Sequence, residues 1–447
     1  MDIRTQVATK QKALENAVAQ ALDLAAQKSD AAEVAINKST GFSVSTRMCE
    51  VENIEYNSDG ALGITVYCNQ CKGSASTSDL STEAIQKTVE AAIDIAQYTS
   101  QDPYAGPAPK ELMATDIPDL DLFHPQPMDT KIAIEKAIQA ERAGLALDPR
   151  IKQSDGASYD HYHGIRVYGN SNGLLASFPT SRYGLSTLLI AQGSDGKMER
   201  DYSYTASRLA DKLWAPEKVG LDAAHRTLAR LGAKRLKTTQ APVLFAADVA
   251  TGLLGHLVMA ISGGNLYRDS SFLVDSLHSQ ILPKWFSISE RPHIKQALAS
   301  TPFDSEGVFT QDREIVHNGV LETYLLTSYA ARKMNMLPTG HAGGIHNWFV
   351  QSHGGDLNAL LKTMQRGLLV TELMGQGVNI VTGDYSRGAS GFWVENGEIQ
   401  YPVTEITIAG NLKDMFNNML AVGSDIETRS QIQTGSILIE KMKIAGI

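Results

Sequence analysis

The spacing of apolar residues changes between two periods along the first half of the chain. Apolar residues at helical spacing, with polar residues between them, predict an amphipathic helix near the N-terminus: Leu14, Val18, Ala21, Leu22 and Ala25. A period of two follows, in which apolar and polar residues alternate: Val34/Ile36, Phe42/Val44 and Ile64/Val66. Because Thr40-Gly41 and Asp59-Gly60 lie between these runs, we expect a meander of short antiparallel strands with turns at those two places.

The same succession of periods then occurs a second time. A helix with Ser81 as its N-cap is predicted from the spacing of Ile85, Val89, Ala92, Ile93 and Ala96, and an alanine-rich helix over 130–147 ends at Asp148-Pro149. Strand-like segments follow at 164–168, 174–178, 185–191 and 202–207. A last helix contains Val219, Ala223, Leu228 and Leu231. Helix, strands and helix therefore occur twice, which suggests a duplicated α+β unit.

The second half of the chain differs in pattern. The polar stretch 234–242 ends in a proline, and we place a domain boundary between residues 237 and 238. Beyond it, glycine-rich sequence carries short strand-like pieces and only two convincing helices, at 328–335 and 356–366. The predicted fold class is α+β: an N-terminal domain, 1–237, of two helix–antiparallel-strands–helix units, followed by a compact, mostly β C-terminal domain, 238–447.

Composition supports a globular protein of two domains. The chain has 447 residues, of which 43% are hydrophobic and 20% charged. Its net charge of −9 argues against a nucleic-acid or anionic-membrane partner. Residues 1–6 are polar and lack the apolar core of a signal peptide, and no apolar run reaches the length of a membrane span. We therefore expect a cytoplasmic protein.

Cysteines and histidines give few metal signals. Cys68 and Cys71 form a single C-x-x-C without a second pair, which favours a reduced pair in a hairpin over a zinc or redox site. His161 and His163 share one face of a strand, but chelation needs a third ligand, so a surface or strand-end pair is the favoured interpretation.

Two further groups of residues are candidates for contacts. His341, His346 and His353 lie in a glycine-rich loop, the kind of segment that often binds ligands, so they are candidate substrate or partner contacts. Arg226 and Arg230, with Lys234, form a basic stripe on a helix, which we interpret as a solvated face because the chain is acidic overall.

The common catalytic motifs are absent from the sequence: it contains no P-loop, no G-x-S-x-G elbow and no H-E-x-x-H. The one dense polar group is Asp384, Ser386, Arg387 and Ser390. It would suit a non-metal hydrolase only if a base lay within hydrogen-bond reach of a serine, and the sequence places no base there. This remains a minor alternative.

Three segments carry a resemblance to a known family. Residues 301–307, 383–399 and 401–412 resemble the signatures of the TldD/PmbA metallopeptidase family, in its non-zinc PmbA/TldE branch. The resemblance extends over essentially the whole chain. It implies a cytoplasmic peptidase built from two related subunits, in which the TldD-type partner holds zinc through an H-E-x-x-x-H helix and a cysteine.

The resemblance also implies that this chain has lost that metal site. In the matching segment, 253–261, Gly255 and Ala260 stand where the ligand histidines would be, and His256 where the glutamate would be. Glycine and alanine offer no donor atom, and one imidazole does not hold a catalytic zinc. We therefore expect no catalytic residue, metal ligand or cofactor in this chain, and zinc in the partner subunit.

The function predicted from the resemblance is that of a subunit which completes the chamber of a heteromeric zinc metalloprotease acting on unfolded peptides. A β-rich domain could bind an extended peptide by strand addition. Asp384 and Arg387, with the histidine loop, are the candidate contacts. The expected partners are a TldD-type subunit and a peptide, with a homodimer open as the state of the chain alone. The alternative is a non-enzymatic interaction protein, in line with the family's older label of DNA gyrase modulator.

Overall fold

The computed structural model of the protein describes residues 2–127 and 129–447. Met1 and Met128 lie outside the described residues. Met1 belongs to the polar stretch 1–6, which lacks the apolar core of a signal peptide. Within the part of the chain that is described, no helix is both long enough and apolar enough to cross a membrane.

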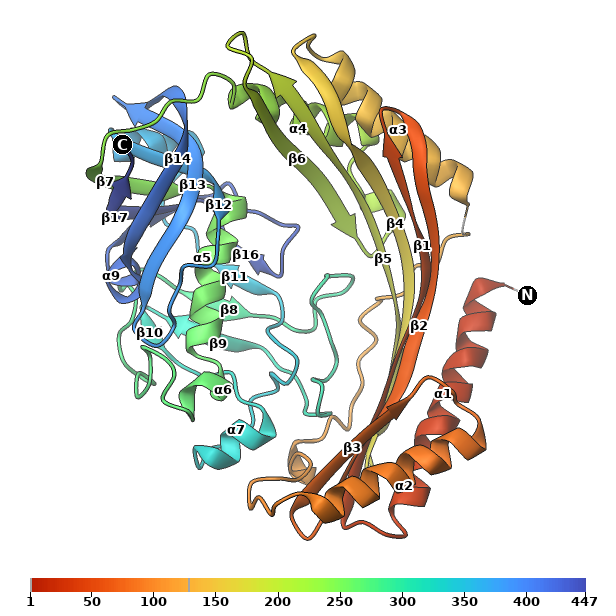
Figure 1. Cartoon of the computed structure of the whole chain (residues 1–447). Helices are drawn as coiled ribbons and strands as arrows, with labels where there is room; N and C mark the ends of the chain where they lie inside the picture. The colour runs from red at the N-terminus through yellow and green to blue at the C-terminus, as the bar shows by residue number, and fades with distance from the viewer. Residues whose placement is uncertain (1, 128) are drawn as a thin grey trace.

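The N-terminal half forms one long antiparallel sheet with helices on one face (Figure 1). Its first unit consists of α1 (Ile3–Ala25), β1 (Ala31–Arg47), β2 (Glu50–Cys68), β3 (Cys71–Thr77) and α2 (Thr82–Tyr98). Its second unit consists of α3 (Thr130–Ala146), β4 (Ile151–Asn170), β5 (Leu175–Gln192), β6 (Met198–Ser207) and α4 (Pro216–Ala229), with single turns η1 (Lys110–Leu112) and η2 (Ala210–Lys212) between elements. The strand order is β3-β2-β1-β4-β5-β6. The two units therefore meet at β1 and β4, and the strands of each unit follow in chain order outward from that pair.

Each unit buries its own helix pair against its part of the sheet. Apolar residues of α1 and α2 pack with Val34, Ile36 and Ile64, and those of α3 and α4 pack with Phe42 and Tyr183. Ser81 accepts a hydrogen bond from the backbone N–H of Ala84 and so caps α2 as the sequence indicates. The expected α+β fold is confirmed, with two helix–strands–helix units in the N-terminal half.

The strands are longer than the sequence predicts, because two of the expected turns are wrong. β1 runs unbroken through Thr40-Gly41 and β2 through Asp59-Gly60, and 174–178 and 185–191 belong to the single strand β5. A Cβ on Gly41 would lie 2.2 Å from the backbone oxygen of His161 on the neighbouring β4. Glycine is therefore required there by the close approach of two strands.

The two hairpin turns of the first unit carry no glycine. Met48 and Cys49 join β1 to β2, and Asn69 and Gln70 join β2 to β3, all four with positive φ between 51° and 65°, as in two-residue type I′ turns. Cys68 and Cys71 face each other across the second turn as free thiols, so this C-x-x-C is a hairpin pair.

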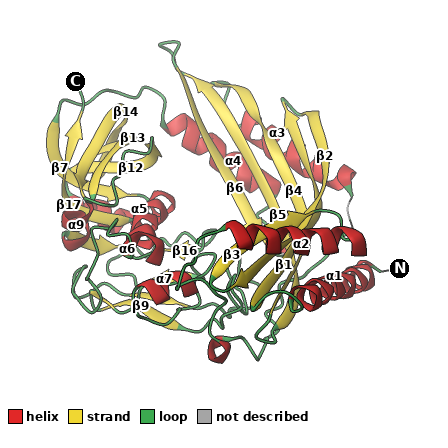
Figure 2. Ribbon diagram, turned by 60° about the horizontal axis from the view of Figure 1, so that its bottom comes forward, coloured by secondary structure: helices red, strands yellow, loops and turns green. Residues whose placement is uncertain are grey.

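The C-terminal half contains two sheets and five helices among the described residues (Figure 2). A five-stranded sheet has the order β10-β9-β8-β11-β16, built from β8 (Ile288–Glu290), β9 (Arg313–His317), β10 (Val320–Leu321), β11 (Trp348–Val350) and β16 (Ile432–Gln433). A six-stranded sheet has the order β14-β13-β12-β7-β17-β15, built from β7 (Thr239–Phe245), β12 (Gly367–Met374), β13 (Asp384–Glu395), β14 (Glu398–Asn411), β15 (Met419–Val422) and β17 (Ile437–Ala445). Because β14 also pairs with β17, five of its strands close into a ring.

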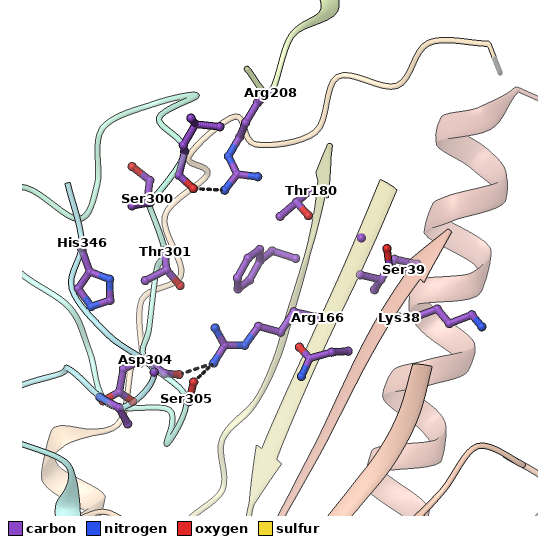
Figure 3. A pocket seen from close by; sticks show the side chains of 18 of the residues that line it. Lys38, Ser39, Arg166, Thr180, Arg208, Ser300, Thr301, Asp304, Ser305 and His346 are labelled. Carbon is purple, nitrogen blue, oxygen red and sulfur yellow. Dashed lines mark hydrogen bonds between the residues drawn. The ribbon is translucent and has the colours of Figure 1, made fainter. Parts of the chain in front are cut away.

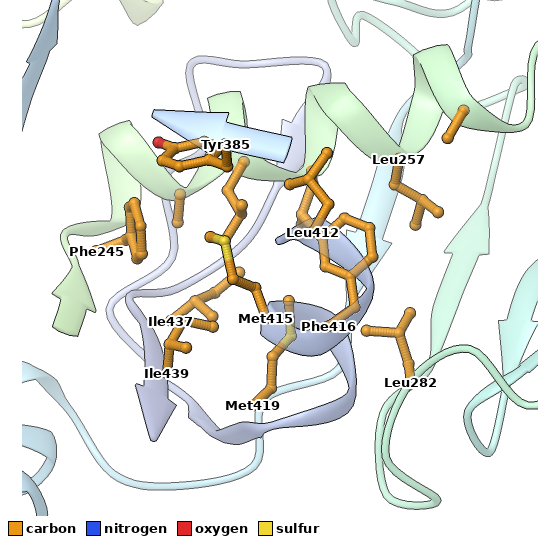
Figure 4. Close-up of a cluster of buried hydrophobic side chains, with 14 of the residues drawn as sticks. Phe245, Leu257, Leu282, Tyr385, Leu412, Met415, Phe416, Met419, Ile437 and Ile439 are labelled. Carbon is orange, nitrogen blue, oxygen red and sulfur yellow. The ribbon is translucent and has the colours of Figure 1, made fainter. Parts of the chain in front are cut away.

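The helices are α5 (Ala247–Ala260), α6 (Gly263–Leu266), α7 (Ser328–Lys333), α8 (Leu357–Met364) and α9 (Leu412–Asn417). The two expected from apolar spacing are α7 and α8. The pattern misses α5 because apolar residues occur on most of its sides and two glycines interrupt it. Leu257 of α5 packs in one buried cluster with Tyr385 of β13 and Phe416 of α9 (Figure 4). The division at residues 237 and 238 stays a prediction.

Ion pairs connect the long sheet to the C-terminal half. Arg226 of α4 pairs with Asp201 of β6 at 3.2 Å and with Asp248 of α5 at 2.9 Å, while Arg230 pairs with Asp201 and with Glu372 of β12. The two arginine side chains are only 29% and 12% exposed. The expectation of a solvated basic face is therefore wrong, because the C-terminal part of α4 lies against carboxylates that are distant in the sequence.

Candidate functional site

The segment that resembles a degenerate zinc helix is α5. A Cβ added to Gly255 would meet no atom within 4 Å, whereas Ala260 is completely buried in the core. Five residues along an α-helix separate side chains by about 140°. The two positions therefore point in different directions, and neither carries a donor atom.

His256, between them, belongs to a polar group that we call the unpartnered cluster: His256, Tyr385 and Arg387. The imidazole packs edge-on against the Tyr385 ring of β13, with centroids 5.9 Å apart and planes at 77°. The Nε2 of His256, the hydroxyl of Tyr385 and the Nε of Arg387 are buried without any hydrogen-bond partner. Among the described residues only one other buried side-chain atom, Oγ of Ser203, is in that state. Three such atoms in one place are unusual, since buried polar atoms are nearly always paired.

At neutral pH this cluster contains one cation, the Arg387 guanidinium, and two uncharged groups, the His256 imidazole and the Tyr385 phenol. Burial lowers the pKa of His256, and the charge of Arg387 lowers it further. Burial raises the pKa of Tyr385 to about 12, although Arg387 acts in the opposite direction. At neutral pH the imidazole is therefore uncharged and the phenol protonated. Within residues 2–127 and 129–447, no carboxylate forms an ion pair with Arg387.

A pocket of about 310 Å³ lies beside the cluster, between the α4–β6 end of the long sheet and α5 with β12. Arg387, Thr251 and Gly252 line it. The other charged lining residues are Arg226 and three carboxylates. Asp201 pairs with both Arg226 and Arg230, Asp248 pairs with Arg226, and Glu372 pairs with Arg230. Of the two lining arginines, Arg387 is the one that forms no ion pair with a described carboxylate.

The residues around α5 do not fit a zinc ion. His256 is a single imidazole with a guanidinium nearby, and zinc sites use three or four N, S or O donors. In the described part of the chain, no three His, Cys, Asp or Glu side chains lie close enough together to hold a metal. Cys49, Cys68 and Cys71 lie at hairpin ends of the N-terminal sheet.

His341 and His346, two of the candidate contacts, instead form a buried network with Glu290 of β8. The Glu290 carboxylate bonds His341 Nε2 at 2.7 Å and accepts from the His346 backbone N–H at 2.7 Å and the Trp348 indole N–H at 2.9 Å. Burial acts to raise the pKa of Glu290, but the hydrogen bond and charge of His341 outweigh it and lower the pKa. This network fastens the glycine-rich loop to the five-stranded sheet.

A second pocket, of about 410 Å³, lies between the long sheet and the loops of the C-terminal half (Figure 3). Arg166 of β4 reaches across it and donates to the backbone oxygen of Asp304 at 2.8 Å and to Ser305 Oγ at 3.2 Å. His346 lines the same pocket. Burial raises the pKa of Asp304 to about 7, and neighbouring Glu306 contributes, although three backbone N–H groups oppose the rise. Asp304, from the 301–307 segment, therefore shapes a turn.

The other candidate contacts lie apart from these groups. His353 is exposed and stacks on Trp285, with ring centroids 4.4 Å apart. Asp384 is exposed and accepts a hydrogen bond from Thr382 Oγ1 at 2.7 Å. Because side chains alternate along β13, Asp384 and Ser386 lie on the face opposite Arg387. In the polar group proposed for a non-metal hydrolase, Arg387 therefore lies apart from Asp384 and Ser386. As contacts to substrate or partner, all five residues stay predictions.

His161 and His163 are not a surface pair, and that expectation is wrong. They are 2% and 8% exposed, on the helix-covered face of β4, with their Nε2 atoms 3.0 Å apart. The rings of Phe42, Phe123 and Tyr183 surround them. Burial lowers the pKa of each imidazole to about 4, and their proximity adds to this for His161.

Sequence reasoning missed Tyr385, Glu290 and Arg166 as members of these groups. For Tyr385 a signal existed, since it precedes Arg387 by two residues in a strand and therefore shares its face. Glu290 and Arg166 had none, because their hydrogen-bond partners are 51 to 139 residues distant along the chain.

Comparison with known proteins defines the class. Three family models, described as domain 1, the central domain and the C-terminal domain of PmbA/TldA metallopeptidases, match residues 32–96, 123–231 and 238–446. The chain therefore has the domains of a metallopeptidase family.

The relatives specify the branch. Metalloprotease PmbA of Escherichia coli O157:H7 is 59% identical over 100% of this chain and 99% of its own length, and a PmbA homolog of Haemophilus influenzae is 59% identical over 98% and 97%. The chain belongs to the PmbA/TldD metallopeptidase family, as the resemblance indicates.

Solved structures agree in fold. A Bacteroides thetaiotaomicron protein described as a candidate modulator of DNA gyrase superposes with a TM-score of 0.91, at 27% identity over 97% of this chain and 98% of that one. TldE from Thermococcus kodakarensis superposes with a TM-score of 0.84, at 20% identity over 96% and 100%.

Proposed function

We propose that this chain is the non-zinc subunit of a heteromeric TldD/PmbA-type metallopeptidase that degrades or trims unfolded peptides. A TldD-type partner carries the zinc, and this chain completes the chamber and is inactive alone. The observation that carries the proposal is the donor set on α5: one imidazole, with Gly255 and Ala260 pointing apart and Arg387 nearby. No proteolytic step is assigned to residues of this chain.

Two features of the fold support a role in holding peptide. The edge strands β3 and β6 leave one side of each strand unpaired in the long sheet, where an extended peptide can add through its main chain. The two pockets described above both lie between the sheet and the C-terminal half. Asp201 and Tyr202 of the edge strand β6 line one of these pockets, so substrate captured at that edge would be close to polar groups of both halves.

Reconstitution tests this proposal. The purified chain, a TldD-type subunit and their mixture are each given an unstructured peptide, with and without a chelator. We expect the chain alone to be inert and the mixture to be active and chelator-sensitive. His256→Ala in this chain should leave the zinc content of the mixture unchanged, because His256 is not a ligand. Cleavage by the isolated chain would contradict the proposal.

The proposal includes a cytoplasmic location and no bound cofactor in this chain. Cell fractionation with an antibody to the chain tests the location, and recovery in the periplasmic or membrane fraction would contradict it.

A second candidate function is that of a regulatory interaction protein. Its support is the description of the Bacteroides relative as a candidate modulator of DNA gyrase. Capture of gyrase subunits by this chain in cells lacking a TldD-type subunit would favour it, and capture that depends on that subunit would favour the peptidase assembly.

A further inference from the structure

We propose that the 410 Å³ pocket between the long sheet and the C-terminal loops recognises one carboxylate of the peptide substrate, with Arg166 as the group that binds it and Arg208 as a second positive charge. The inference rests on the proposed function for its ligand class. The site lies on the face of the sheet opposite the helices, apart from α5 (Figure 3).

The charged groups that line this pocket are unbalanced. Among its described lining residues, Asp304 is the one carboxylate, against the guanidinium groups of Arg166 and Arg208. Lys38 also lines the pocket, but it alternates with Ile36 onto the helix-covered face of β1, so its ammonium group is not counted here. The pocket therefore holds more positive than negative charge, in a chain whose net charge is −9.

Asp304 does not neutralise this charge. Its carboxylate is occupied by the backbone N–H groups of Glu306, Val308 and Ala342, at 2.8, 3.0 and 2.9 Å. Burial raises its pKa to about 7, so it is only partly ionised at neutral pH. Burial also lowers the pKa of His346, the remaining titratable group of the lining, which keeps that imidazole uncharged.

Neither arginine has a carboxylate partner in the described part of the chain. Arg208 donates to three backbone oxygens, those of Ser181, Ala297 and Leu298, at 3.3, 3.0 and 2.7 Å. Arg166 donates through Nη2 alone, to the backbone oxygen and the serine hydroxyl described above. All of these acceptors are neutral, and burial lowers the pKa of both guanidinium groups. A counter-charge in the pocket would therefore stabilise both cations.

Arg166 has free donors that are open to the pocket. Its Nε and Nη1 form no hydrogen bond with described residues, and they are not among the buried side-chain atoms that lack a partner, so solvent reaches them. The rings of Phe178 and Phe303 pack against the guanidinium, with centroids 6.0 and 5.4 Å from its Cζ. Either nitrogen can donate a charge-assisted hydrogen bond to a carboxylate.

Neutral polar groups lie on the same wall of the pocket. Asn37 and Ser39 of β1 and Thr180 of β5 line it from the sheet face that carries Arg166. Their side chains have no hydrogen-bond partner among the described residues, so their donors are available to a ligand. A carboxylate accepts several hydrogen bonds at once and suits this set. The ligand is therefore a single carboxylate of a peptide, whether its C-terminus or an acidic side chain.

Peptide binding to the full chain tests this inference. Three unstructured peptides of one sequence are used: a free C-terminal acid without Asp or Glu, its C-terminal amide, and the amide with one internal Glu. We expect a carboxylate to tighten binding about tenfold over the plain amide, although the net charge of −9 alone would weaken it. Tighter binding of the acid alone identifies the C-terminus, and of the Glu peptide alone an acidic side chain. Tighter binding of both identifies any carboxylate.

A charge placed inside the pocket separates the site from general charge effects. Ser39→Asp puts a carboxylate beside the same donors and removes no side-chain hydrogen bond, so it should abolish the preference. Ser76→Asp is the matched control, because Ser76 of β3 is an exposed serine on the same face of the sheet, outside the pocket. It should keep the preference of the wild type.

Arginine variants assign the charge. Arg166→Gln should remove most of the preference, and Arg166→Lys should retain part of it because a cation remains. Arg208→Gln should weaken the preference several-fold. Both arginines also hold loops of the C-terminal half, so urea unfolding is measured for each variant, and one that does not fold leaves the decision to Ser39→Asp.

Equal binding of all three peptides, or a carboxylate preference that Ser39→Asp keeps as fully as Ser76→Asp does, would overturn the inference. That failure is distinct from failure of the proposed function, which concerns zinc and peptidase activity of the mixture with a TldD-type subunit. An active, chelator-sensitive mixture without a carboxylate preference would remove the inference alone.

Discussion

The buried histidine pair predicts how the stability of the long sheet depends on pH. His161 and His163 lie within 3.0 Å of each other, and each has a pKa of about 4 in the folded chain against an ordinary value of 6.5. Between these values the unfolded chain binds more protons than the folded one. Stability therefore rises with pH through this window, is complete above about pH 6.5, and is lost as the pH falls toward 4.

The magnitude follows from the same values. Linkage gives a loss of about 2 kcal/mol for each imidazole between pH 7 and pH 5, and on the order of 4 kcal/mol for the pair. Asp304, whose pKa burial raises to about 7, acts in the opposite direction, because it takes up its proton in the folded chain. The wild-type pH dependence alone is therefore not diagnostic.

A double variant isolates the pair. His161→Gln with His163→Gln replaces both imidazoles by amides that do not titrate, and it keeps Asp304. Urea unfolding, followed by circular dichroism at pH 7 and pH 5, gives the change in unfolding free energy for each protein. We expect the wild type to lose about 4 kcal/mol more than the variant on acidification. An equal change in both proteins would refute the assignment of neutral, buried imidazoles.

Three other predictions concern packing and ion pairs, and urea unfolding checks each. Glu290→Ala leaves the His341 imidazole, the Trp348 indole and the His346 backbone N–H without their shared partner. It should lower the unfolding free energy by about 3–5 kcal/mol, and unchanged stability would contradict a structural role for these hydrogen bonds. Gly41→Ala should lower the unfolding free energy by about 1–3 kcal/mol, because its Cβ would clash with the backbone of β4. Gly63→Ala is the control and should be near neutral, because a Cβ there meets nothing within 4 Å. Equal effects of the two substitutions would contradict the close approach of β1 and β4. Arg230→Met should cost about 2–4 kcal/mol by removing the partner of carboxylates in β6 and β12, and retention of stability would show that those pairs contribute little.

The sequence predicts the helices of the N-terminal half well because each has one apolar stripe that faces the same sheet. The observed α2 begins at Thr82, next to the predicted cap Ser81, and α3 begins at Thr130, where the sequence places its start. The sequence predicts strands that are shorter than the observed ones, and the reason is physical. Gly41 and Gly60 look like turn residues, but they make room for neighbouring strands, and local sequence does not show which strand passes beside them.

Burial and pairing of polar residues were the hardest features to predict. Alternation places His161 and His163 on one face of β4, but helices far along the chain decide whether that face is covered. Arg230 likewise meets a carboxylate 142 residues away. Such contacts depend on tertiary structure, and a basic stripe on a helix looks the same whether it faces water or acid.

The candidate site was predictable only in part. The resemblance directs attention to Gly255, His256 and Ala260, but the alternation of β13 separates Arg387 from Asp384 and joins it to Tyr385. The histidine loop, interpreted as a binding segment, is held by Glu290, which bonds the His341 imidazole and accepts from the Trp348 indole and the His346 backbone N–H.

The central claim is that this chain provides no zinc site. Its most direct test is the zinc content of the purified chain and of its complex with a TldD-type subunit, by elemental analysis after dialysis against zinc-containing and then metal-free buffer. The account predicts far less than one zinc per chain for the isolated protein and zinc in proportion to the TldD-type subunit in the complex. One tightly held zinc per isolated chain, with peptidase activity that follows it, would contradict the account.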